Sequence, residues 1–99
     1  MNVDGKERLK RLYRRLKKNY PDADLRFTDE TLVMDKHKLP KYKVAYYLNG
    51  RQMCDAIWGW GSYGFSEGLL EFYCGGEPEG FITERRAYNL FKGQMEASE

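Results

Sequence analysis

The residues of this sequence best suited to chemistry are one histidine, His37, and two cysteines, Cys54 and Cys74. A zinc site needs closely spaced pairs of ligands, and two cysteines twenty positions apart with one distant histidine do not supply them. His37 has no evident nucleophile as a partner in a catalytic triad, so we interpret it as a solvated side chain. We expect both cysteines to be reduced, small apolar residues; a single disulfide between them is the alternative.

Carboxylates offer a second route to chemistry, because two glutamates can pair for acid–base catalysis. A cluster of glutamates is more often a solvated acidic rim, however. The phosphate-binding motif GxxxxGKS/T is absent, and the glycines of WGWGSYG have neither the lysine of that motif nor the spacing of a dinucleotide fingerprint. We therefore expect a protein that is not an enzyme and that holds no cofactor and no metal. The clustered glutamates are Glu67, Glu71, Glu77 and Glu79.

The aromatic, glycine-rich run from Trp58 to Gly76 has the most distinctive composition of the chain. In one interpretation its rings pack a bulged loop beneath the core. In the other, exposed rings on a glycine-hinged loop stack on a base or anchor a protein partner. Trp60 lies between two glycines, so we predict that it is the more exposed tryptophan and takes part in recognition with Tyr63. Trp58 is predicted to anchor this loop to the sheet.

A basic amphipathic helix is predicted near the start of the chain. Asp4 caps it, Glu7 follows at the spacing of a capping box, and Pro21 ends it. Apolar residues recur at helical spacing and form one stripe that faces the core. The members of this stripe are Leu9, Leu12, Tyr13, Leu16 and Tyr20.

The other face of this helix carries eight cations and can bind a polyanion or an acidic partner. Like charges four residues apart repel, so this density exceeds what solubility requires. A merely solvated face is the alternative. Two arginines in the first turn of a C-terminal helix are further candidates, because the helix dipole disfavours cations there. The candidate binding cations are Arg11, Arg14, Arg15, Lys18, Arg85 and Arg86.

Charge is unevenly distributed along the chain. Residues 1–43 carry 13 basic and 7 acidic side chains, a net +6, whereas residues 44–99 carry 4 basic and 8 acidic ones, a net −4. No apolar run approaches the roughly 20 residues that span a bilayer, and the N-terminal residues lack the apolar core of a signal peptide. We therefore expect a cytoplasmic protein without membrane contacts.

A β-hairpin over residues 41–58 is the most specific structural prediction. Asn49-Gly50 is a strong two-residue turn of the type with φ > 0 at both positions. Continuous pairing from this turn puts Asp55 on the face that meets the helices, where a carboxylate needs a partner. It also turns Trp58 away from that face, together with Cys54 and Ala56. The predicted pairs are Leu48 with Arg51, Tyr46 with Met53, Val44 with Asp55 and Tyr42 with Ile57.

The remaining elements complete an α+β fold in a single domain, residues 1–99. Short strands are predicted around Leu25 and Phe27 and at Leu32–Met34, followed by a basic loop, Lys36-His37-Lys38. Residues 68–74 fit a strand or a short helix, and we predict the strand, followed by another at Glu79–Ile82. Thr83 then caps the C-terminal helix, whose core stripe is Ala87, Tyr88, Phe91 and Met95. The expected architecture is an antiparallel β-sheet of four to five strands with an N-terminal basic helix and a C-terminal helix.

The segment AIWGWGSYGFSEGLLE, followed by EGFITERRAYNLF, resembles short uncharacterised proteins from phages and prophages of Gram-positive bacteria. The resemblance covers roughly the C-terminal half of the chain and includes no known active site. In size and character the chain is also similar to phage anti-defence proteins, including anti-CRISPR proteins. The resemblance implies a non-catalytic, phage-encoded inhibitor in the host cytosol, whose partner is a host defence protein or nucleoprotein complex.

Two other functions fit the same residues. The first is direct nucleic-acid binding by the basic helix and the aromatic loop, with an affinity that falls steeply with salt. The second is a small-ligand binder that sequesters a nucleotide in the aromatic loop. The sequence leaves the oligomeric state open.

Overall fold

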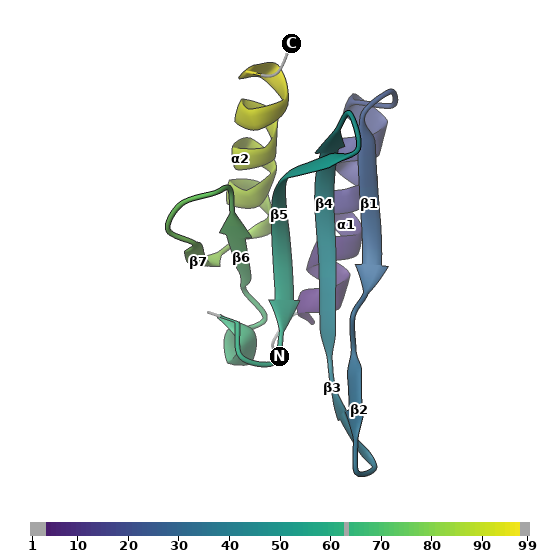
Figure 1. Cartoon of the computed structure of the whole chain (residues 1–99). Helices are drawn as coiled ribbons and strands as arrows, with labels where there is room; N and C mark the ends of the chain where they lie inside the picture. Colours follow the sequence, from purple (N-terminus) through teal and green to yellow (C-terminus); the bar gives the residue numbers. More distant parts are fainter. Residues whose placement is uncertain (1–3, 63, 98–99) are drawn as a thin grey trace.

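The computed structural model describes residues 4–62 and 64–97 of the chain. One antiparallel sheet has five strands in the order β1-β4-β5-β6-β7, and both helices lie on the same face of it (Figure 1). A separate two-stranded ribbon, β2–β3, continues beyond the sheet. The predicted α+β fold is therefore confirmed. The elements are α1 (Gly5–Asn19), β1 (Asp24–Asp29), β2 (Leu32–Met34), β3 (His37–Leu39), β4 (Lys41–Leu48), β5 (Arg51–Gly59), the 3-10 helix η1 (Phe65–Glu67), β6 (Leu70–Tyr73), β7 (Glu79–Ile82) and α2 (Glu84–Ala97).

Helix α1 begins and ends where its local sequence predicts. The Asp4 carboxylate accepts a hydrogen bond from the Lys6 backbone N–H at 3.0 Å, which satisfies one of the unpaired donors of the first turn. The helix ends at Asn19, two residues before Pro21. Its apolar stripe is packed on the sheet, and each fully buried leucine contributes about 2 kcal/mol. The completely buried leucines are Leu9, Leu12 and Leu16.

Helix α2 is also confirmed, including its cap and its core stripe. The Thr83 hydroxyl accepts a hydrogen bond from the Arg86 backbone N–H at 3.2 Å. Phe91 is completely buried, and its ring meets that of Phe72 edge-on, with 5.3 Å between the ring centroids. The predicted core residues of this helix are all buried: Ala87, Tyr88, Phe91 and Met95. Among the described residues, no helix is long and apolar enough to cross a membrane.

The β4–β5 hairpin forms as predicted at its turn but not along its length. Asn49 and Gly50 adopt φ of 53° and 78°, the left-handed conformation that this turn requires. The pairing then slips, because Tyr47 lies opposite Gln52 whereas Tyr46 lies opposite Cys54. One extra residue of β5, at position 53, is accommodated as a β-bulge. The predicted register is therefore wrong beyond Gln52.

The bulge exchanges the two faces of β5, because a slip of one residue reverses every side chain that follows. Cys54 and Ala56 face the helices and are 2% and 0% exposed, and Trp58 lies on the same side. Asp55 lies on the open face, by which we mean the sheet face away from the helices. Continuous pairing would have put this carboxylate in the apolar core, at a cost in desolvation free energy.

Two other segments test the sequence predictions. Residues 36–38 were predicted to be a loop; instead the chain turns at Asp35 and Lys36, and residues 37–39 form strand β3. The prediction was wrong because this turn contains no glycine or proline, although both of its residues have positive φ. The ambiguous residues 68–74 contain strand β6, as predicted, and β7 spans Glu79–Ile82.

Candidate functional site

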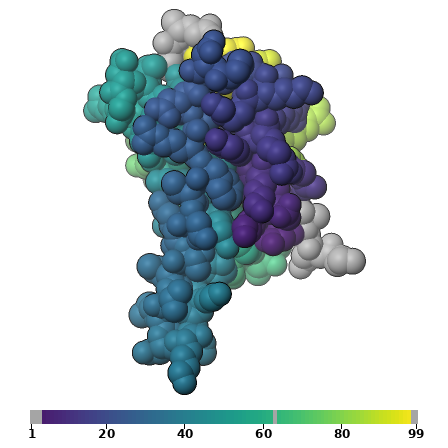
Figure 2. Space-filling model, turned by 90° about the vertical axis from the view of Figure 1, so that its right-hand side faces the viewer, coloured from purple at the N-terminus to yellow at the C-terminus, as the bar shows by residue number. Residues whose placement is uncertain are grey.

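The structure places three consecutive apolar residues in water at the end of a projecting hairpin. We call this hairpin, residues 32–39, the finger. Figure 2 shows it extending from the body of the molecule. The whole molecule, with the finger, measures 44 × 28 × 26 Å along its principal axes. Leu32, Val33 and Met34 are 58%, 68% and 57% exposed. Scattered exposed apolar residues are ordinary on protein surfaces, but a contiguous group on a projection is a candidate interaction site.

The exposed apolar side chains of the finger lie on both of its faces. Pairing of β2 with β3 sets Leu32 opposite Leu39 and Met34 opposite His37, so these side chains share one face. Val33 lies opposite Lys38 on the other face. A tight turn at Asp35 and Lys36, with φ of 47° and 69°, closes the hairpin without spare residues.

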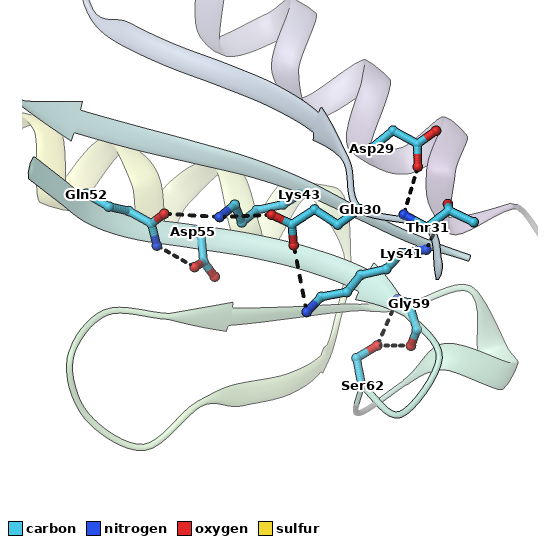
Figure 3. A network of polar contacts seen from close by, with 9 residues as sticks. All are labelled: Asp29, Glu30, Thr31, Lys41, Lys43, Gln52, Asp55, Gly59 and Ser62. Carbon is cyan, nitrogen blue, oxygen red and sulfur yellow. Dashed lines mark hydrogen bonds and ion pairs between the residues drawn. The ribbon is translucent and has the colours of Figure 1, made fainter. Parts of the chain in front are cut away.

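Hydrogen bonds and ion pairs hold the root of the finger against the sheet (Figure 3). The Glu30 N–H donates to the Lys41 carbonyl at 2.7 Å, and the Lys41 N–H donates to the Thr31 hydroxyl at 3.3 Å. The Thr31 N–H donates to the Asp29 carboxylate at 2.9 Å, and hydrogen bonds from Thr31 lower the pKa of Asp29. Glu30 also pairs with Lys43 at 3.3 Å. The direction of the finger is therefore fixed at its root.

The loop that carries Trp60 packs against this root. The Trp60 N–H donates to the carbonyl of Pro40 at 2.9 Å, and the residue is 63% exposed. Gly59 allows the close approach, because a Cβ there would lie 2.8 Å from Cα of Lys41. The Ser62 hydroxyl donates to the Gly59 carbonyl at 2.7 Å and closes the turn (Figure 3). Trp60 is thus the more exposed tryptophan, as predicted.

Trp58 anchors this loop from the helix side of the sheet. Its indole N–H donates to the carbonyl of Phe65 at 3.0 Å, and its ring stacks on Tyr42 and Phe65. It also packs on Gly5, where a Cβ would collide with the indole. The predicted anchoring role is borne out, but the prediction that Trp58 faces away from the apolar side was wrong because of the bulge. Tyr63, the other aromatic residue assigned to recognition, lies outside the described residues.

A shallow groove crosses the open face from Trp60 toward Tyr73. It consists of two adjoining hollows of about 170 and 270 Å³ that share Lys41, Ile57 and Glu71 in their walls. Tyr73, at the far end, is 44% exposed. Charges of both signs line the groove, so it offers neither a phosphate site nor a simple cation site. We call it the open-face groove.

Asp55 sits in a polar network within this groove (Figure 3). The Gln52 amide donates to the Asp55 carboxylate at 2.7 Å, and the Lys43 ammonium donates to the Gln52 amide oxygen at 3.2 Å. Burial raises the pKa of Asp55, while nearby Lys43 and the Gln52 hydrogen bond partly offset that effect. Among the residues that the structure describes, no group of three or more His, Cys, Asp or Glu side chains can hold a metal.

Most cations of α1 are occupied by contacts within the chain. Arg11 forms an ion pair with Glu84 of α2 at 3.0 Å. The Arg15 guanidinium lies over the Tyr88 ring, 4.0 Å from its centroid. These two predicted binding residues therefore join the helices to each other. Three more cations of the helix contact their own surroundings: Lys6 over the Tyr42 ring, Lys10 with Glu7, and Lys17 with the carbonyl of Ala23.

All six predicted binding cations are exposed, and three of them have no charge or hydrogen-bond partner among the described residues. Arg14 and Lys18 lie four positions apart on α1 and have no charge or hydrogen-bond partner in the described part of the chain. Arg85 is likewise exposed at the start of α2. Arg86, by contrast, makes a two-pronged contact with the Glu79 carboxylate at 2.7 and 3.0 Å, which lowers the pKa of Glu79. Arg86 thus ties α2 to β7.

The predicted site residues do not form one surface. Helix α1 covers one face of the sheet, and the groove that Trp60 borders lies on the other. Sequence reasoning found Trp60 but missed the finger. The signal was three consecutive apolar residues, Leu32–Met34, directly followed by the polar sequence DKHK. Compared with known proteins, the chain matches no family, no curated protein and no solved structure.

Proposed function

We propose that this protein is a non-catalytic binding protein that docks on a larger protein by inserting the finger into an apolar cleft. The observation that carries the proposal is the exposure of Leu32, Val33 and Met34 at 58%, 68% and 57% on a projecting hairpin. The wider role predicted from the resemblance is part of this proposal: a phage-encoded inhibitor of a host defence or nucleoprotein complex.

Burial of the finger in a partner would supply a useful binding energy. Three such side chains expose a few hundred Å², and apolar surface yields about 25 cal/mol per Å² removed from water, so several kcal/mol are available. The tight turn and the anchored root set the finger in place before binding, which reduces the entropy lost on association. The finger is therefore suited to be the central anchor of an interface.

The size of the finger favours a cleft over a flat surface. A stable interface buries about 800 Å² on each partner, more than three side chains provide on one side. A cleft contacts both faces of the hairpin and can reach Trp60 at its root. Trp60 would then supply the aromatic contact that is common at interface anchors. Lys38, on the side of the hairpin, would meet the wall or rim of the cleft, and the charged turn residues Asp35 and Lys36 at the tip would need polar partners at its base.

Direct nucleic-acid binding is the second candidate function, because Arg14 and Lys18 are exposed on α1. The ion pair of Arg11 and the ring contact of Arg15 leave fewer free cations than the sequence suggests. A phosphate backbone rewards many such contacts at once. Sequestration of a nucleotide has less support, because the open-face groove is shallow and contains the carboxylates of Glu71 and Asp55.

The test is a variant without the finger, in which residues 32–39 are replaced by Asn-Gly. None of these residues belongs to the buried core, so the variant should fold with an unchanged thermal midpoint. A matched control, Arg14→Gln/Lys18→Gln, removes the two exposed cations of α1 that have no partner and leaves the finger intact. Each protein is used to capture partners from host lysate, in parallel with and without nuclease treatment.

We expect the wild type and the cation control to retain the same protein partner and the fingerless variant to lose it. A photo-crosslinking residue at position 33 should then attach to that partner, whereas one at the exposed Lys92 of α2 should not. Capture that survives removal of the finger would refute the proposal. Capture that needs Arg14 and Lys18, and that nuclease abolishes, would favour nucleic-acid binding.

A further inference from the structure

Cys54 lies in strand β5, and Cys74 directly follows the neighbouring strand β6. Strands β5 and β6 pair antiparallel, with Asp55 opposite Tyr73 and Ala56 opposite Phe72. One further step in this register sets Cys54 opposite Cys74. The β-bulge is responsible, because it turns Cys54 to the helix side, where Cys74 also packs against the core. Residues directly opposite each other in a sheet share a face.

The spacing of such a pair suits a covalent bond. Opposed residues of antiparallel strands have Cα atoms about 4.5–5.5 Å apart, within the roughly 4.4–6.8 Å that a disulfide spans. The Cys74 sulfur lies 3.6 Å from the carbonyl oxygen of Met53, the residue next to Cys54. Gly75 follows with φ of 73° and Gly76 comes next, so the backbone beyond Cys74 can adjust.

We propose that Cys54 and Cys74 form an oxidative modification site, which a low-molecular-weight disulfide such as oxidised glutathione converts into an intramolecular disulfide. Both thiols are free in the structure. The inference is independent of the proposed function, because neither cysteine belongs to the finger.

The exchange proceeds in two steps. The Cys74 thiolate attacks one sulfur of the reagent, forms a mixed disulfide and releases the first reagent thiolate. Cys54 then loses its proton to solvent and attacks the Cys74 sulfur, which expels the second reagent thiolate. Two protein thiols are thereby oxidised to one disulfide, and one reagent disulfide is reduced to two thiols.

Accessibility decides which thiol reacts first. Cys54 is 2% exposed, and burial raises its pKa to about 12, so it forms little thiolate in the folded protein. Cys74 is only half-buried and directly follows strand β6. The second step becomes fast only because the mixed disulfide holds its target sulfur beside Cys54.

The bond would act on the loop that carries Trp60. It joins the two ends of the segment from residue 54 to residue 74, which contains Trp60 and η1. A cross-link of this kind stabilises a protein mainly by restricting the unfolded chain. The oxidised protein should therefore unfold at a higher temperature than the reduced one.

The test treats the reduced, purified wild-type chain with oxidised glutathione at mildly alkaline pH. Intact mass and non-reducing peptide maps are followed over time. We expect a transient glutathione adduct, then a monomer that has lost two hydrogen atoms and contains a Cys54–Cys74 linked fragment. Its thermal midpoint should rise by several degrees and should return to the starting value on reduction.

Two variants check the order of the steps. Cys54→Ala should stop at the glutathione adduct on Cys74. Cys74→Ala should react with glutathione at about one tenth of the wild-type rate or more slowly still, because only the buried thiol remains. If Cys54→Ala fails to fold, rapid acid quenching of the wild-type reaction still shows which cysteine carries the first adduct. A stable adduct, a disulfide-linked dimer or an unmodified chain as the wild-type end product would overturn the proposal.

Discussion

Trp58 and Trp60 are two positions apart, yet they have opposite roles. Trp58 stacks between Tyr42 and Phe65 and covers Gly5, so it connects the start of α1 to the end of β5. Trp60 instead points its ring into water at 63% exposure. The two residues differ because β5 ends at Gly59. Trp60 therefore lies outside the strand, and the alternation that would put it on the same face as Trp58 no longer applies.

Replacement of each tryptophan by alanine should separate folding from recognition. Trp58→Ala removes a large ring and its hydrogen bond from a packed site, so we expect a loss of about 3 kcal/mol in the free energy of unfolding. Trp60→Ala should leave the stability nearly unchanged and weaken partner binding. Thermal and denaturant unfolding measure the first effect. A marked loss of stability in Trp60→Ala would show that its ring belongs to the core.

Asp55 should oppose folding at neutral pH. Burial raises its pKa in the folded state above the value in the unfolded chain, so the folded state binds the proton more tightly. The stability that depends on this proton is present at low pH and is lost as the pH rises through the folded-state pKa.

Asp55→Asn should therefore stabilise the protein at pH 7 relative to the wild type, and the difference should shrink on acidification. Unfolding of both proteins across the acidic range measures it, because the carboxylates with lowered pKa, such as Asp29 and Glu79, cancel in the comparison. A wild type that is more stable than Asp55→Asn at pH 7 would mean that the bonds of Gln52 and Lys43 outweigh burial.

At the scale of secondary structure, the sequence predicted the features that depend on residues close together in the chain. Caps and helical periodicity located both helices, and Asn49-Gly50 located the hairpin turn. The β-bulge at Met53 was beyond such reasoning, because it is favoured by the burial of a whole strand face rather than by its neighbours in sequence. The finger was missed for a related reason: the exposure of Leu32–Met34 depends on how far the ribbon projects past the sheet.

The turn of the finger contains a residue with a strained backbone conformation. Lys36 has φ of 69°, which costs a residue with a Cβ about 1 kcal/mol or more. Lys36→Gly should relieve this strain and slow amide hydrogen exchange in the finger.

The matched control is Lys38→Gly, which places glycine in strand β3 and should speed exchange instead. Exchange rates at the paired residues Met34 and His37 report both effects. Equal changes in the two variants would mean that the turn is not the strained point.

At the scale of the whole molecule, several cations of the basic first part of the sequence have partners within the chain. Ion pairs connect elements that are distant in the chain, such as Arg11 of α1 with Glu84 of α2. Closer in the chain, Lys41 and Lys43 pair with Glu30 across the root of the finger. These contacts leave fewer cations without a partner than the sequence suggests.

The salt dependence of DNA binding tests this conclusion. Eight free cations on α1 would give a slope of log K against log salt of about −7, whereas Arg14 and Lys18 alone, the exposed cations without a partner, would give about −2. We expect weak binding with the shallow slope, measured by titration of a labelled duplex at several salt concentrations. Arg14→Gln/Lys18→Gln should remove most of what remains. A steep slope that this variant leaves unchanged would place the contact elsewhere.

Because the finger contributes no residue to the core, mutations in it should have little effect on the stability of the fold. Changes at Leu32, Val33 or Met34 would alter only the affinity for the partner, whereas changes in the core of the body would alter the stability of the protein. Such a division lets one scaffold acquire new targets by drift in a single short segment. The same division makes the position of the finger a natural graft site, at which a foreign hairpin with paired ends could be displayed on an unaltered body.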